Sequence, residues 1–153
     1  PALGALLGVA GALVVMRENR RRDRRHHFDT ALNELLLVCA TGEEIETMVG
    51  HINTKKFDQV LLNAVTNAIQ HFHDQLEELP AFENVSQDDI PMTDRARFRL
   101  VWKALRGRSA WAEKTTLTPA NYGTLRPAID DLFKHITPFR QHVQGLATGT
   151  LRR

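Results

Sequence analysis

The histidines are the residues of this chain whose types and spacing could do chemistry. Asp131, His135 and His142 stand at positions i, i+4 and i+11, so on a helix they line one flank and could contribute to a metal site in a bundle. His71 and His73 are two residues apart and point about 200° apart on a helix, so they cannot share a metal on one face. The chain has no Glu-x-x-His sequence, the signature of di-iron bundles. Histidines that border a core are ordinarily packed or hydrogen-bonded, so we predict no metal ligand and no cofactor.

The other residue types that take part in catalysis form no constellation. Cys39 falls on an apolar helix face, where we expect a buried, inert thiol rather than a nucleophile. The pairs Asp88-Asp89 and Asp130-Asp131 are adjacent in sequence, so their carboxylates point in different directions and belong on a solvated surface. The sequence contains no G-x-S-x-G, no glycine-rich phosphate loop and no H-E-x-x-H. We therefore predict no catalytic residues and no enzyme activity.

A basic segment, residues 94–108, could bind an anionic partner. It holds six basic side chains against Asp94, and Trp102 lies within it as a ring that could stack on a base. Phe98, Trp102 and Leu105, however, are spaced to face inward, and residues 28–93 carry a charge of −10 that gives the arginines an intramolecular partner. We therefore favour intramolecular pairing of these arginines over binding of a partner, and we do not expect the segment to bind nucleic acid. The candidate contacts are Arg95, Arg97, Arg99, Arg106 and Arg108.

Hydrophobic periodicity predicts that all of these residues lie on helices. Apolar side chains recur at intervals of three and four residues through most of the chain, and no segment alternates with the period of two that a strand requires. Phe28 to Cys39 continue a helix that Thr41 and Gly42 are expected to end, and a short helix with Ile45 to Ile52 on one side follows. The fold class is therefore all-α.

The second half of the chain has clear start and stop signals. The longest apolar seam runs from Phe57 to Leu79 in a helix that Thr54 begins and Pro80 ends. A helix from Thr93 to about Arg106 is expected to stop at Gly107, and residues 109–114 could add a turn. Thr118-Pro119 predicts the start of the last helical region, which Gly123 weakens and Pro127 restarts. That helix carries apolar residues to Val143, and Pro138 should kink it or end its regular hydrogen bonding early.

The sharpest feature of the sequence precedes these helices. Residues 1–16 have no charged and no strongly polar side chain, whereas the next nine residues include six arginines. Sixteen helical residues span about 24 Å, less than the ~30 Å hydrocarbon core of a bilayer. A cleavable signal peptide would have its positive charges before the apolar run, not after it. A helix buried in a soluble core remains the alternative to a membrane anchor. Arg17 could extend the anchor by snorkelling.

The arginines and small residues around this stretch predict its contacts. An excess of Lys and Arg stays on the cytoplasmic side, so the rest of the chain is expected to be cytoplasmic, or on the equivalent side of an organelle membrane. Gly4, Gly8 and Ala12 recur every four residues and form a smooth face for another membrane helix. The basic residues predicted to contact lipid headgroups are Arg17, Arg20, Arg21, Arg22, Arg24 and Arg25.

Length and composition set the remaining limits. The 153 residues, 42% hydrophobic and 25% charged, suffice for one folded domain with a modest core. The single cysteine excludes an internal disulfide. We expect a single transmembrane helix (1–16), a basic juxtamembrane collar (17–27), a bundle of about four helices (28–143) with a surface loop (80–93), and a flexible tail (144–153).

The predicted function is that of a non-enzymatic, single-pass membrane protein, an accessory or scaffold subunit of a membrane protein complex that acts through its cytoplasmic bundle. Expected partners are other membrane subunits or further copies of the chain, together with an anionic lipid surface. The alternative is a soluble helical protein with a buried N-terminal helix, whose basic helix 94–108 binds an anionic partner such as nucleic acid.

Overall fold

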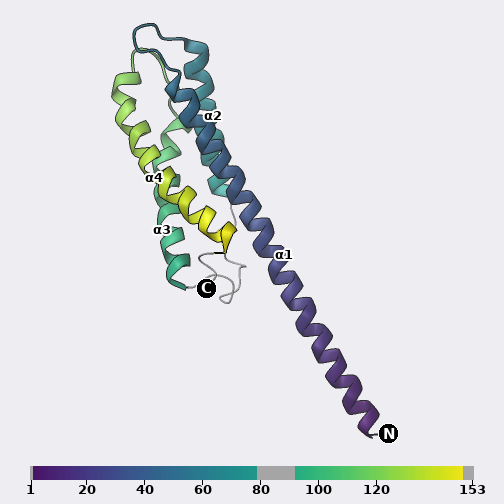
Figure 1. Cartoon of the computed structure of the whole chain (residues 1–153). Coiled ribbons are helices and arrows are strands. Elements are labelled where there is room, and N and C mark those ends of the chain that lie inside the picture. Colours follow the sequence, from purple (N-terminus) through teal and green to yellow (C-terminus); the bar gives the residue numbers. More distant parts are fainter. Residues whose placement is uncertain (1, 79–91, 150–153) are drawn as a thin grey trace.

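A computed structural model describes residues 2–78 and 92–149, and this part of the chain is helical without any strand, which confirms the all-α prediction (Figure 1). Residues 51–58 connect α1 to α2, and residues 114–121 connect η1 to α4. The predicted surface loop 80–93 lies outside the described residues up to residue 91. The helices are α1 (Ala2–Gly50), α2 (Gln59–Glu78), α3 (Met92–Ser109), the short 3-10 helix η1 (Ala110–Glu113) and α4 (Tyr122–Thr148).

The two halves of α1 have different surroundings. Figure 1 shows the N-terminal half extending far beyond the other helices as a lone rod. Every residue from Gly8 to Arg20 is exposed, whereas Leu32, Leu35 and Val38 are buried, so contact with the bundle begins near residue 31. Within the described part of the chain, no helix combines the length and the apolar character needed to cross a membrane.

The hydrophobic core lies where the C-terminal half of α1 meets α2, α3 and α4. Helix α1 packs on α2 and α4, and α3 packs on the same two helices from the other side. Each large apolar side chain buried here contributes about 1.5–3 kcal/mol. The largest of the fully buried side chains are Leu35, Ile45, Leu62, Ile69, Phe72, Leu76, Leu105, Leu117, Ile129, Leu132 and Phe139.

The prediction that α1 ends at Thr41 and Gly42 is wrong, because the helix continues to Gly50 and absorbs the short helix expected after it. Gly42 is buried, and a Cβ placed on it would lie 3.2 Å from Ile136 Cγ2 and 3.6 Å from Phe72 Cε2. The Thr41 hydroxyl donates to the Leu37 carbonyl one turn back, at 3.1 Å, so it needs no capping role. The glycine therefore serves close helix packing rather than a helix end.

Helix α2 begins later than the predicted Thr54, because Asp58 is the residue that caps it. The Val60 backbone N–H donates to Asp58 Oδ1 at 3.0 Å, which satisfies one of the free donors at the start of the helix. Phe57 lies just before the helix and packs edge-on against the Tyr122 ring, with centroids 5.3 Å apart. The predicted end of the seam at Leu79 and Pro80 lies outside the described residues.

The prediction that Gly107 ends the next helix is also wrong. Gly107 lies inside α3, and no atom comes within 4 Å of where its Cβ would be, so only helix propensity is lost there. Phe98 and Leu105 are buried as predicted, with Val101 and Trp102 partly buried. The turn expected over residues 109–114 is present as η1.

Thr118 accepts a hydrogen bond as a capping residue does, as predicted, but the helix begins three residues later than the predicted Pro119. The Thr118 N–H donates to Asn121 Oδ1 at 2.7 Å, the Asn121 N–H donates to Thr118 Oγ1 at 3.2 Å, and α4 begins at the next residue, Tyr122. The helix then runs through both Pro127 and Pro138 without a restart. It continues to Thr148, five residues into the expected tail, because Leu146 is fully buried in the core, and Gly149 ends it with a φ of 76°.

Candidate functional site

Three potential metal ligands meet where α2 faces η1. His73 and Glu77 stand one turn apart on α2, and Glu113 is the last residue of η1. His73 Nε2 lies 3.1 Å from Glu77 Oε1 and 3.2 Å from Glu113 Oε1. The imidazole is 3% exposed, while both glutamates are nearly half exposed. Among the described residues, this is the group of histidine and acidic side chains whose ligand atoms all lie within 4.8 Å of one another.

The hydrogen bond between Ser109 and His73 determines which nitrogen of the imidazole ring faces the glutamates. The Ser109 hydroxyl donates to the Leu105 carbonyl at 2.8 Å, so its oxygen is left to accept from His73 Nδ1, 2.9 Å away. Nδ1 therefore carries a hydrogen. Nε2 then points at two carboxylate oxygens that only accept, and a bare lone pair there would be repelled. A metal ion shared by Nε2 and the two carboxylates would remove this repulsion.

A cavity of about 400 Å³ opens beside this cluster and connects it to solvent. Besides the three ligand residues it is lined by Lys103, Arg106, Gly107 and Ala110. Arg106 Nη2 lies 3.8 Å from Glu77 Oε1, at the outer limit of an ion pair, and its guanidinium also lies over the Trp102 ring, 5.5 Å from the centroid. The arginine is 46% exposed and so is free to leave Glu77 without being buried unpaired.

Sequence reasoning missed this cluster because it tested His73 only against His71. The structure confirms that those two histidines diverge, since His71 is exposed and His73 is buried. The His-x-x-x-Glu spacing of His73 and Glu77 was a usable signal, because side chains four residues apart share a helix face. Glu113 had no such signal, because it reaches the cluster from 36 residues beyond Glu77 and only the fold brings it there.

The histidines that were singled out on the last helix do not come together. His135 Nδ1 donates to the Asp131 carbonyl at 2.8 Å, and the Asp131 carboxylate is engaged by Arg108 Nε at 2.6 Å. His142 instead stacks on Phe98, with ring centroids 5.7 Å apart. These contacts account for Asp131, His135 and His142 as structural side chains.

Cys39 is buried, as predicted from its position on an apolar face. Burial, and to a smaller degree the negative charge of Glu43, raise the pKa of the Cys39 thiol to about 12. Arg140 acts in the opposite direction but is held by Glu43, whose Oε1 lies 3.4 Å from Arg140 Nη1. A thiol in this environment stays protonated at neutral pH and is a poor nucleophile.

Some arginines of the basic segment, residues 94–108, form ion pairs with other helices, and others point to solvent. Arg106 pairs with Glu77 of α2, which belongs to the acidic segment 28–93 where a partner was predicted. Arg108 pairs instead with Asp131 of α4, outside that segment. Arg97 and Arg99 are exposed on α3. The side chain of Arg95 lies outside the described residues. The four arginines whose side chains the structure describes are therefore not gathered into one cluster.

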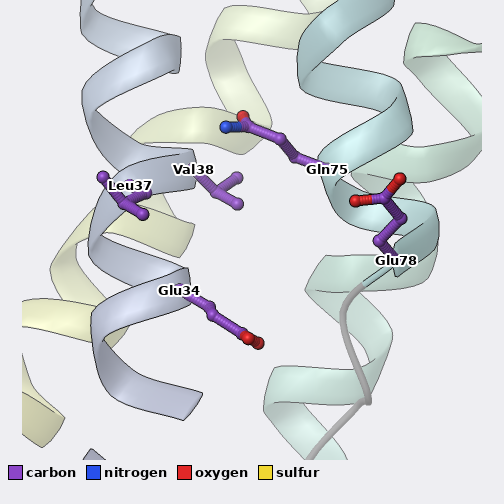
Figure 2. Close-up of a pocket in the computed structure, with 5 residues that line it drawn as sticks. All are labelled: Glu34, Leu37, Val38, Gln75 and Glu78. Carbon is purple, nitrogen blue, oxygen red and sulfur yellow. The ribbon is translucent and has the colours of Figure 1, made fainter. Parts of the chain in front are cut away.

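A groove between α1 and α2 is a second concave feature among the described residues. It has a volume of about 260 Å³ and is lined by Glu34, Leu37, Val38, Gln75 and Glu78. Figure 2 shows Gln75 reaching from α2 toward α1, with Glu34 and Glu78 at the rim. Leu37 is 63% exposed, and Gln75 Oε1 is shielded from solvent with no hydrogen-bond partner among the described residues. The groove thus combines exposed apolar surface with an unused acceptor and two acidic groups.

The described part of the predicted membrane segment, residues 8–16, is exposed and apolar. Five large apolar side chains, Val9, Leu13, Val14, Val15 and Met16, are each more than half exposed. Gly8 and Ala12 of the predicted packing face are exposed too, and no atom approaches within 4 Å of where a Gly8 Cβ would be; the surroundings of Gly4 lie outside the described residues.

The predicted headgroup contacts follow on the same part of α1. Arg17, Arg20 and Arg22 are exposed, as a contact with lipid headgroups requires. The side chains of Arg21, Arg24 and Arg25 lie outside the described residues.

Comparison of the chain with protein-family models, with curated proteins and with solved structures found no match. The function must therefore be argued from the residues and their arrangement.

Proposed function

We propose that this protein is a non-enzymatic accessory or scaffold subunit of a membrane protein complex. Residues 1–16 insert into a bilayer, the arginines of residues 17–25 lie among the headgroups, and the helical bundle is displayed on the cytoplasmic side. One observation carries the proposal: an apolar helix stands away from the bundle (Figure 1), and its described side chains, residues 8–16, are all exposed. A helix that is hydrophobic all round belongs in a protein core or in a membrane.

The pattern of the segment favours lipid over a second protein helix. A helix-helix seam is a stripe, with polar residues on the opposite face, whereas residues 8–16 contain no charged or strongly polar residue on any face. Arginines follow at once, as expected at a boundary between hydrocarbon and anionic headgroups, where each contributes about 1 kcal/mol. Because the segment spans about 24 Å against ~30 Å of hydrocarbon, Arg17 must snorkel or the bilayer must thin locally.

The bundle supports the scaffold part of the proposal through its surface. The groove between α1 and α2 offers Leu37, the free Gln75 acceptor and the rim carboxylates of Glu34 and Glu78 to a partner (Figure 2). It faces solvent on helices whose other sides are fixed in the core. A partner with an apolar side chain flanked by basic residues would complement it.

Membrane attachment can be tested with the full chain and vesicles of phosphatidylcholine with and without phosphatidylserine. We expect the protein to float with vesicles and to resist extraction by salt and by alkaline carbonate. Leu13→Glu with Val14→Glu should abolish both properties, because each buried charge costs several kcal/mol. The control is Leu100→Glu, which places a carboxylate at a side chain that is 70% exposed on α3 and should change nothing.

The basic juxtamembrane collar, residues 17–27, should contribute to membrane binding separately from the apolar segment. Replacement of Arg17, Arg20 and Arg22 by Gln should weaken binding to phosphatidylserine vesicles and make that binding less sensitive to salt. The protein should still resist extraction by carbonate. Release of the parent protein by carbonate would contradict the proposal. The proposal would also be contradicted if the protein, without detergent, formed a concentration-dependent oligomer in which residues 1–16 are protected from solvent. The apolar segment would then bind other copies of the chain. In cells, protease added to the cytoplasmic side should digest the bundle.

A further inference from the structure

We infer that His73, Glu77 and Glu113 form a binding site for a divalent metal ion, and that the ion is Zn²⁺. This site is independent of the membrane segment and belongs to the bundle. It joins one turn of α2 to η1 through side chains that are 36 residues or more apart in sequence.

The spacing of the ligand atoms fits a tetrahedral ion. Zn²⁺ binds imidazole nitrogen and carboxylate oxygen at about 2.0–2.2 Å, which places neighbouring ligand atoms of a tetrahedron about 3.3–3.5 Å apart. The distances from His73 Nε2 to Glu77 Oε1 and Glu113 Oε1 are 3.1 and 3.2 Å. Along these two edges coordination requires movements of only a few tenths of an ångström. All three ligand atoms lie within 4.8 Å of one another, and the exposed glutamates can move to close the remaining edge.

The chemistry of the donors selects the ion. One imidazole with two carboxylates suits a metal of intermediate hardness such as Zn²⁺, whereas Mg²⁺ and Ca²⁺ prefer oxygen ligands alone. The Ser109 hydroxyl accepts from His73 Nδ1 and itself donates to the Leu105 carbonyl, so the ring is held with Nε2 toward the glutamates. Metal-binding histidines are oriented by such an outer partner.

Charge and access are also adequate. Two carboxylates balance the charge of a divalent ion, and Arg106, at 3.8 Å from Glu77, can withdraw toward solvent and the Trp102 ring. The cavity beside the cluster gives the ion a route in and leaves its fourth position to water. A bound ion would fasten α2 to η1 and so stabilise this end of the bundle.

The test is calorimetric titration of the untagged full chain, stripped with a chelator and kept in detergent micelles, with ZnCl₂ and separately with MgCl₂. We expect one Zn²⁺ per chain and no Mg²⁺ binding. Glu113→Gln and Glu77→Gln should weaken Zn²⁺ binding more than the roughly 10- to 100-fold that loss of an outer partner costs. The matched controls His71→Gln and Glu78→Gln, exposed neighbours on the same helix, should bind as the parent does.

Two further measurements separate this site from ion binding elsewhere. Zn²⁺ at about 100 times its dissociation constant should raise the Tm of the parent and of His71→Gln by roughly 5–10 °C, and that of Glu113→Gln by much less. In nitrogen NMR spectra, Zn²⁺ should change the chemical shift of Nε2 in His73 and in no other histidine. The inference is overturned if no saturable binding is seen, or if Glu113→Gln and Glu77→Gln bind Zn²⁺ as tightly as the parent. Because Glu113 is half exposed, its variant should fold, as circular dichroism can verify.

Discussion

Gly42 of α1 lies directly against Ile136 of α4, so close that a Cβ at position 42 would come within 3.2 Å of Ile136 Cγ2. The side chain of Ile136 has no exposed surface and therefore no room to withdraw far. This contact sets how near the two helices approach, at the midpoint of the buried half of α1.

Substitution of Gly42 should therefore depend on size. Gly42→Leu forces extra atoms into a filled core and should lower the free energy of unfolding by about 1–3 kcal/mol or more. Gly42→Ala gains up to ~1 kcal/mol of helix propensity, which the clash with Ile136 offsets. The control is Gly107→Ala in α3, which meets nothing within 4 Å and should stabilise by about 1 kcal/mol. Urea unfolding measures all three, and equal effects of the two alanine substitutions would show that the contact at Gly42 is not tight.

A second prediction concerns Thr66, which bridges α2 and the turn before α4. Its Oγ1 donates to the Leu62 carbonyl at 2.9 Å and accepts from the Leu117 backbone N–H at 2.9 Å, and both Thr66 and Leu117 are buried. Thr66→Val keeps the shape but leaves the Leu117 N–H without its acceptor, so we expect a loss of about 1–3 kcal/mol. Thr47→Val removes a comparable hydroxyl bond to Glu43 on the exposed side of α1 and should cost little. Denaturant curves with similar shifts for both variants would contradict this account.

The Cys39 thiol gives a prediction with a defined pH dependence. Because the pKa is raised to about 12 in the folded protein, the native thiol stays neutral where the unfolded thiol ionises. The unfolded state therefore binds fewer protons above about pH 9, and stability should fall as the pH rises from about 9 toward 12. The fall should be smaller in Cys39→Ala, as unfolding curves at pH 7.5 and 10 can show.

The same burial should slow modification of Cys39. At pH 8 the folded thiol should react with a disulfide reagent on the order of a thousandfold more slowly than the urea-unfolded chain, because little thiolate is present. Prompt reaction of the folded protein at pH 8 would mean that the helix face around Cys39 is open.

The helices themselves could be predicted from the sequence because apolar spacing reports local geometry. The seam around Phe72 and Leu76, the inward face of α3 with Phe98 and Leu105, and the capping exchange at Thr118 all depend on residues within a few turns of one another. Errors arose where a residue serves a distant contact. Gly42 was interpreted as a helix end because its partner, Ile136, is 94 residues away, and Gly107 was interpreted as a stop although the helix tolerates it at an exposed position.

The metal-ligand cluster could be predicted only in part, for the same reason. His73 and Glu77 share a helix face, which periodicity can show, but Glu113 joins them only through the packing of η1 on α2. The imidazole orientation depends on Ser109, a small residue at the end of α3 with no motif around it. Long-range pairings of this kind carry no local pattern, and so a three-dimensional structure is needed to find them.

Removal of the N-terminal half of α1 should leave the bundle intact. The described side chains from Gly8 to Arg20 are all exposed, and among the described residues burial starts with Leu32. The chain that begins at Asp29 therefore keeps every buried residue that the structure describes. Its Tm, measured beside the full chain in the same detergent, should agree within about 2 °C, because surface changes away from packed groups cost little. An acidic residue at the new helix start also interacts well with the helix dipole.

The informative control is a chain that begins eleven residues later, at Ala40. It loses Leu32, Leu35, Val38 and Cys39 from the core, each worth about 1.5–3 kcal/mol when fully buried. Their sum approaches the 5–15 kcal/mol that stabilises a typical domain, so this chain should not unfold cooperatively on heating. If instead the chain from Asp29 lost more than about 2 kcal/mol, the apolar segment would have to pack on its own bundle. The proposal that it is left free for a membrane would then fail, because the unpartnered face on which it depends would not exist.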